Sequence, residues 1–153
     1  MLSLVDFIKT NTWGRPRDVV RLLLAIQKKS PRSERIGEAE LKIGLDEYSR
    51  ASLKELVDEL SVVHGKTILD ALKRGIKKKN YHDADEFVQS LPLPGVNEAR
   101  FLDDAFSLGL FGGYQPETGN FYWAHRGETT FRPHLQVRIH PALWNELSIR
   151  GSD

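Results

Sequence analysis

The sequence predicts a mainly α-helical fold with a small antiparallel β-hairpin or sheet. Up to residue 109, apolar side chains recur at the three- and four-residue spacing of amphipathic helices. Beyond that point, short β-prone runs alternate with turn-forming glycine, proline and asparagine. The length of 153 residues suits one medium domain or two small packed subdomains.

The N-terminal part of the sequence predicts two helices. The first ends near Asn11, and the second begins at Pro16, whose missing N–H is harmless in the first turn of a helix. Between Val19 and Ile26 apolar residues almost surround the axis of the second helix, which predicts that this helix is buried. Ser30 ends the helix, and an exposed basic connector follows.

Residues 38–64 predict the next helical segment. We expect a break near Gly44 and a stronger helix after it, which Gly65 ends. Asp83 and Asn97 are well suited to cap the N-termini of two later helices. The helices expected in this part of the chain are at residues 66–78, 83–90 and 97–109.

The C-terminal part predicts strands. The turn-forming letters QPETGN separate two β-prone runs, Leu110–Tyr114 and Phe121–His125, which predicts a β-hairpin. The alternation in LQVRIH predicts another strand, and Pro141 is expected to begin a terminal helix over PALWNELSI.

Three helices followed by a hairpin is the element order of a winged helix-turn-helix, with the wing at residues 110–127. We therefore expect two packed parts. One is a helical segment at residues 1–64, and the other is a winged-helix domain at residues 65–153.

The aromatic run Phe121 to Trp123 has two interpretations. One is stacking on nucleic-acid bases. The simpler one is core packing, because alternation along a strand places Phe121 and Trp123 on one face and Tyr122 on the other. Trp144 is expected to anchor the terminal helix in the same way.

The composition excludes several classes of function. The chain has no cysteine, which excludes disulfides, thiolate nucleophiles and cysteine metal sites. The five histidines lack the spacing of a metal site, and no serine lies in a nucleophile elbow. A net charge of +1 excludes a broadly polycationic protein, and no apolar run reaches the ~18 residues of a membrane span. We expect a cytoplasmic protein with no metal site and no membrane partner.

The stretch TWGRPRD, residues 12–18, carries more positive charge than a helix start needs. Arg15 and Arg17 lie beside a helix N-terminus, where free N–H groups and the helix dipole favour anions. A guanidinium group also makes bidentate contacts to phosphate. The alternative is a solvated helix start in which Asp18 pairs locally with an arginine.

WGRPRD followed by an apolar helix resembles the GxPR sensor-2 motif in the helical lid of AAA+ and related STAND-type P-loop ATPases. The later elements resemble the winged-helix region that follows the lid in many bacterial members. The fragments that carry the resemblance are YSRASLKELVDEL, FLDDAFSLGLFGGYQPETGNFYWAHRGE and VRIHPALWNEL. The resemblance implies that Arg17, after the proline, contacts the phosphates of ATP held between core and lid, with Arg15 as a neighbouring candidate.

The sequence departs from that family in one respect that bears on catalysis. It contains no G-x-x-x-x-G-K-[ST] loop and no hydrophobic run ending in an acidic Walker B pair. This chain alone is therefore expected to be no enzyme and to hold no cofactor. ATP enters only if a longer parent protein supplies the ATPase core.

DNA is a further candidate partner, but the helix expected to enter the groove is acidic. It carries Glu98, Asp103 and Asp104 against Arg100, which repels duplex phosphates. If DNA is bound, we expect the basic run before it to make the contacts, although lysines at a helix C-terminus are also explained by the helix dipole and by solubility. The run comprises Lys73, Arg74, Lys77, Lys78 and Lys79.

These observations favour a non-catalytic regulatory and interaction module, the C-terminal part of a P-loop ATPase. It would couple the nucleotide state of an ATPase core to another protein subunit or to DNA. Two alternatives stay open: a stand-alone winged-helix DNA-binding protein, and a protein–protein adaptor that docks through its acidic third helix.

Overall fold

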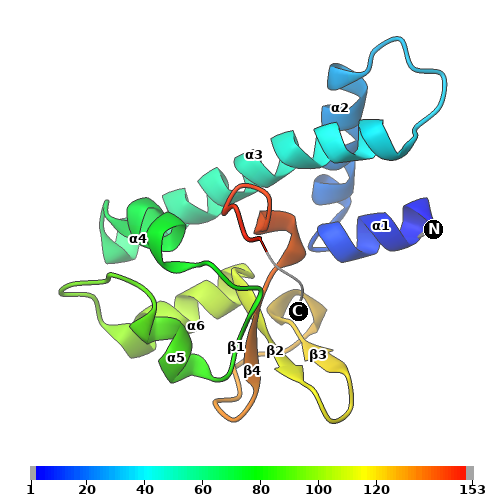
Figure 1. Cartoon of the computed structure of the whole chain (residues 1–153). Coiled ribbons are helices and arrows are strands. Elements are labelled where there is room, and N and C mark those ends of the chain that lie inside the picture. The colour runs from blue at the N-terminus through cyan, green and yellow to red at the C-terminus, as the bar shows by residue number, and fades with distance from the viewer. Residues whose placement is uncertain (1–2, 151–153) are drawn as a thin grey trace.

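The computed structural model describes residues 3–150 and confirms a mainly α-helical chain with a small antiparallel sheet (Figure 1). The N-terminal helices are α1 (Leu4–Asn11), α2 (Pro16–Lys29) and α3 (Glu38–His64). The helices that follow are α4 (Ile68–Gly75), α5 (Ala84–Gln89) and α6 (Glu98–Leu108). The strands are β1 (Asn80–Tyr81), β2 (Phe111–Gln115), β3 (Asn120–Tyr122) and β4 (Gln136–Ile139), with 3-10 turns η1 (Ala124–Arg126) and η2 (Pro141–Leu143).

The expected caps are present on the two short helices. Asp83 accepts a hydrogen bond from the Glu86 N–H at the start of α5, and Asn97 accepts one from the Arg100 N–H at the start of α6. Gly109 ends α6 in the left-handed conformation, with φ of 84°. Local capping chemistry therefore determines where α5 and α6 begin and where α6 ends.

The sheet has the strand order β1-β4-β2-β3, and all neighbours are antiparallel. The expected hairpin is β2–β3, joined through residues 116–119. The strand predicted from LQVRIH is β4, and it lies in the middle of the sheet between β1 and β2. Strand β1 was not predicted, because its two residues follow three lysines and carry no alternating pattern.

One hydrophobic core runs through the chain. Leu22 of α2 and Leu60 of α3 belong to the same buried cluster as Phe106 of α6, Val137 of β4 and Leu143 of η2. Helix α3 lies along both halves, from α2 at one end to α4 at the other (Figure 1). Within the described residues, the two expected segments therefore share their core, on either side of residue 64.

Two expectations for the N-terminal helices were wrong. Helix α3 is continuous through Gly44. The glycine is there because a larger side chain would collide with Ile26 of α2, and it does not mark a break in the helix. Helix α2 is not buried all round: Leu22 and Ile26 are buried, while Val20 and Leu24 are 54% and 56% exposed. Only the face of α2 that packs on α3 is covered.

The helix expected at residues 66–78 is shorter than predicted. It ends at Gly75, where an added Cβ would lie 2.5 Å from the Ser90 carbonyl oxygen, and Ile76 is extended. Lys77, Lys78 and Lys79 therefore follow the helix instead of forming its end.

The C-terminal expectations need two corrections. The terminal helix is only the 3-10 turn η2, which His140 caps by accepting the Ala142 N–H at Nδ1, followed by turns. Ser148 has a φ of 54°, which a right-handed helix does not allow. In the hairpin, Trp123 is buried as expected but Phe121 is 43% exposed, since it lies on the edge strand β3. Trp144 does anchor this region, with its Nε1 donating to the Ile139 carbonyl at 2.9 Å.

Within residues 3–150, none of the helices is both long enough and apolar enough to cross a membrane.

The close approach of α2 and α3 at Gly44 predicts whether an alanine there raises or lowers the free energy of unfolding. In an open helix interior, glycine to alanine stabilises by about 1 kcal/mol. Here the new Cβ would lie 2.2 Å from Ile26 Cγ1 and 2.9 Å from Ile26 Cα. We therefore expect Gly44→Ala to lower the free energy of unfolding by about 1–3 kcal/mol, measured by urea denaturation.

Ala51→Gly, at an exposed position of the same helix, is the control for helix propensity and should cost about 1 kcal/mol. A Gly44→Ala protein more stable than the parent would contradict the close packing of α2 on α3.

Candidate functional site

The arginine-bearing motif is held in place by Trp13, which lies between α1 and α2. The indole is buried, and its Nε1 donates to the Gly109 carbonyl oxygen at 3.0 Å. Its ring stacks on His140 with a centroid distance of 4.4 Å. An added Cβ at Gly109 would lie 2.3 Å from Trp13 Nε1, so this docking requires glycine at the end of α6.

The turn that leads into α2 is also constrained. Thr12 Oγ1 donates to the Ile8 carbonyl and accepts the Gly14 N–H at 3.1 Å. Gly14 has a φ of 70°, a conformation that favours glycine. Pro16 then begins α2, as predicted. The start of α2 is therefore fixed by hydrogen bonds on one side and by Trp13 on the other.

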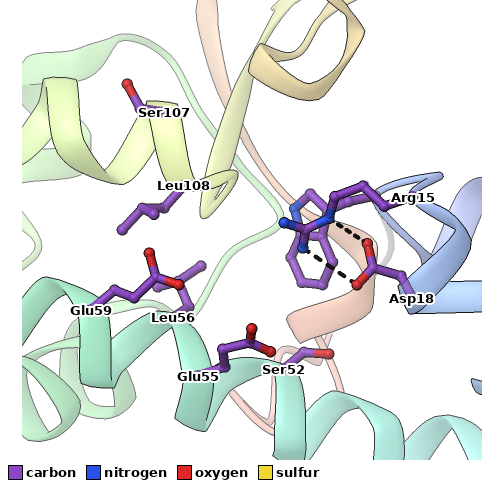
Figure 2. Close-up of a pocket in the computed structure, with 9 residues that line it drawn as sticks. Arg15, Asp18, Ser52, Glu55, Leu56, Glu59, Ser107 and Leu108 are labelled. Atoms are coloured by element: carbon purple, nitrogen blue, oxygen red, sulfur yellow. Dashed lines mark hydrogen bonds and ion pairs between the residues drawn. The ribbon is translucent and has the colours of Figure 1, made fainter. Parts of the chain in front are cut away.

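Arg15 is paired within its own turn. Its Nε and Nη2 donate to the two carboxylate oxygens of Asp18 at 2.7 and 3.3 Å (Figure 2). The hydrogen bond to Asp18 raises the pKa of the Arg15 guanidinium. The Asp18 side chain is 2% exposed, so this pair satisfies a carboxylate that would otherwise be buried alone.

Arg17 is paired at longer range. Its Nη2 lies 2.9 Å from Glu55 Oε1 on α3, and Arg21 contacts the other oxygen of Glu55. The hydrogen bond from Arg21 lowers the pKa of Glu55, with the charge of Arg17 adding to it. The structure thus brings Arg15 and Arg17 to one helix start, but each faces a different carboxylate.

A small cavity of about 100 Å³ lies beside Arg15, between α3 and α6 (Figure 2). Its charged lining is Arg15 against Asp18, Glu55 and Glu59. Ser52 and Ser107 add hydroxyls. Three carboxylates around one guanidinium repel a phosphate, and the cavity is below the ~300 Å³ of ordinary small-molecule sites. In this conformation the pocket holds the arginine in place and is no nucleotide cradle.

Glu55 and Glu59 were not expected from the sequence as neighbours of the motif. They lie one helical turn apart on α3, 38 or more residues from Arg17. Their spacing indicates a common helix face, but nothing in the sequence indicates which loop that face would meet.

The basic run expected to contact DNA is largely neutralised. Lys73 Nζ lies 3.1 Å from Glu146, and Arg74 lies 3.2 Å from Asp70. These two residues belong to α4, and the ion pairs direct them toward two different segments.

The three lysines after α4 are also engaged. Lys78 Nζ lies 2.7 Å from Glu86, and this pairing raises the pKa of Lys78. Lys79 Nζ is 4.6 Å from the centroid of the Trp144 ring, and Lys77 Nζ donates to a backbone carbonyl. Within the run, Lys73, Arg74 and Lys78 are thus paired with carboxylates, whereas Lys77 and Lys79 contact a backbone carbonyl and an aromatic ring.

The acidic third helix keeps most of its expected character. Glu98 and Asp103 are exposed. Asp104 is partly exposed, and its carboxylate lies 2.8 Å from Nε2 of His64 at the end of α3. Within residues 3–150 no group of three or more His, Cys, Asp or Glu side chains is arranged to hold a metal ion.

Comparisons with known proteins assign no family to this chain. No protein-family model, curated protein or solved structure matched the chain.

The imidazoles behind Trp13 predict a pH dependence of stability. Burial lowers the pKa of His125 to about 4 and lowers that of His140 well below its usual range. Both recover an ordinary value of about 6.5 on unfolding. Between these values the unfolded chain binds protons that the folded chain does not, so the free energy of unfolding falls as the pH falls from about 7 to about 4.

We expect His125→Gln to lose less stability than the parent protein over that range, measured by urea unfolding with tryptophan fluorescence. His134→Gln is the matched control, because His134 is exposed, and it should follow the parent curve. Equal losses in His125→Gln and the parent would contradict a neutral, buried His125.

Proposed function

We propose that this chain is a non-catalytic regulatory and interaction module. In this proposal α1–α3 form a lid-like segment, and α4 to β4 form a winged helix that carries the output surface. The module couples the nucleotide state of a P-loop ATPase core, supplied by a longer parent protein, to a partner protein. The observation that carries the proposal is the docking of Trp13 on Gly109 and His140.

This docking connects the arginine motif directly to the second half of the chain. Trp13 and Arg15 are two residues apart, so a shift of the α2 start moves the indole. The indole is hydrogen-bonded to the residue that ends α6 and stacked on the residue that begins η2. Packed interiors transmit such shifts because they have few voids to absorb them.

The two arginines have different parts in this scheme. Arg15 pairs with Asp18, whose carboxylate is buried, so breaking this pair leaves a buried charge without its partner, although solvent screens the half-exposed guanidinium. Arg17 is 57% exposed and pairs with a partly exposed Glu55, an interaction worth about 0–1 kcal/mol. A phosphate of bound ATP therefore displaces Glu55 from Arg17 far more readily than Asp18 from Arg15. Arg17 is the phosphate-sensing residue, and Arg15 holds the turn.

A protein partner fits the charge distribution better than duplex DNA. Three residues of the basic run, Lys73, Arg74 and Lys78, are paired with acids. The exposed side of α6 carries Glu98 and Asp103. An adaptor that uses this acidic surface without any nucleotide is the second candidate.

The first test is the mass of the endogenous protein, by immunoblot of source-cell lysate. The proposal expects a band well above 17.4 kDa. In that parent protein, we expect Arg17→Ala to lower ATP hydrolysis about tenfold to a hundredfold, the value of a hydrogen bond to a charged group.

Two matched variants make this result specific. Arg32→Ala removes an arginine from the exposed connector and should leave hydrolysis unchanged. Glu55→Gln releases Arg17 without removing it and should keep activity near the parent level. A native mass of 17.4 kDa would leave the adaptor and the stand-alone DNA-binding protein as the candidates. Full activity in Arg17→Ala would contradict the phosphate-sensing role of Arg17.

A further inference from the structure

A second surface hollow lies on the other side of His140, where α1 meets the sheet edge. It has a volume of about 170 Å³. Strands β3 and β4, the turns η1 and η2 and the end of α1 all contribute to it. Its lining is Lys9, Thr10, Phe121, Trp123, His125, Arg126, Arg138, His140, Pro141 and Trp144.

Aromatic rings form much of this groove. Phe121 is 43% exposed although core packing was expected for it. Its ring is nearly parallel to that of Trp123, at a centroid distance of 6.2 Å and an interplanar angle of 15°. It is also nearly parallel to Tyr114, at 4.7 Å and 23°. An exposed ring held by parallel neighbours is a preformed platform for another flat group.

Every charged side chain that lines the groove is a cation. They are Lys9, Arg126 and Arg138, and no carboxylate is among the lining residues. Lys9 and Arg126 are exposed and form no ion pair with another residue of the described range 3–150. The basic run after α4 differs in this respect, because acids neutralise most of it.

Arg138 places a positive charge next to two of the aromatic rings of the groove. Its guanidinium lies 4.9 Å from the Trp144 centroid and 5.9 Å from that of Phe121, and its Nη1 donates to Asn80 at 2.9 Å. The low pKa of His125 keeps that imidazole neutral at pH 7, so it does not add to the charge. The groove thus offers flat apolar surfaces with positive charge at their edges.

We propose that this groove binds single-stranded nucleic acid, with one base stacked against Phe121 and the flanking phosphates on Lys9 and Arg126. Bases have π-faces that stack on aromatic side chains regardless of sequence, and cationic grooves follow the phosphates. In a duplex the bases are stacked on one another and cannot reach such a platform. The acidic α6 also disfavours a duplex.

The size of the groove favours a strand over a free nucleotide. Sites that enclose a small molecule usually measure about 300–1,000 Å³. A hollow of about 170 Å³ accepts one flat group and leaves the rest of the ligand outside. This inference goes beyond the proposed function and does not require an ATPase core.

The test is fluorescence anisotropy of a labelled oligo(dT) strand of about 12 nucleotides with the full chain. We expect a dissociation constant of about 1–100 µM at low salt. With two or three phosphate contacts, raising the salt from about 50 to about 200 mM should weaken binding about 7- to 20-fold. The matched duplex should bind more weakly than the strand.

Two substitutions address the two parts of the groove. We expect Phe121→Ala to weaken strand binding about tenfold, which is the scale of losing one stacked base. We expect Arg126→Glu to weaken strand binding more strongly at low salt than at high salt. Val62→Ala removes another exposed apolar side chain, from α3, and Arg32→Glu makes the same charge change in the connector. Both controls should bind like the parent.

Three results would overturn the proposal. One is no binding of the strand, and another is equal weakening by the groove variants and their controls. The third is displacement of the strand by free thymidine monophosphate at equal nucleotide concentration, which would make the groove a nucleotide site. None of them bears on the ATPase proposal, because Arg17 lies outside this groove.

Discussion

The position of Trp13 determines how the two halves of the chain meet. The indole is buried and contacts Tyr48 of α3, Gly109 at the end of α6, and His140 before η2. A buried hydrogen bond and a stacked ring pair each contribute about 1 kcal/mol beyond the apolar area that is removed from water. Since one rigid side chain makes all three contacts, the α2 start, α3 and the end of α6 hold one relative position.

Charge is segregated in a way that the net charge of +1 conceals. Around Arg15 the charged lining is mainly carboxylates, and in the groove beyond His140 it is all cations. The two hollows therefore differ in the sign of the charge that lines them.

Much of the fold was predictable because local chemistry determines it. Pro16, Asp83, Asn97 and Gly109 mark helix ends through φ preference and capping, and those ends were predicted within a few residues. The turn in residues 115–120 predicted the hairpin for the same reason.

The errors come from contacts between distant segments. From the sequence alone, Gly44 suggests a helix break. The close approach of Ile26 on α2 is what explains the glycine at this position. Phe121 alternates with Trp123 as a core residue would, but its strand is at the sheet edge. For the candidate site, Arg15 and Arg17 could be named from the sequence, whereas Glu55 and Glu59 could not, because no local pattern places α3 beside the motif.

A signal between sites needs an element with two accessible arrangements, and contact alone does not supply one. Trp13, His140 and Trp123 form continuous ring contacts from the arginine motif to the aromatic groove. These rings are buried and closely packed, so they transmit a displacement but do not start one. The Arg17–Glu55 pair is exposed and weak enough to exchange its partner. The motif therefore combines an exposed ion pair that can exchange its partner with a rigid inner contact, and the proposed phosphate-driven switch uses both.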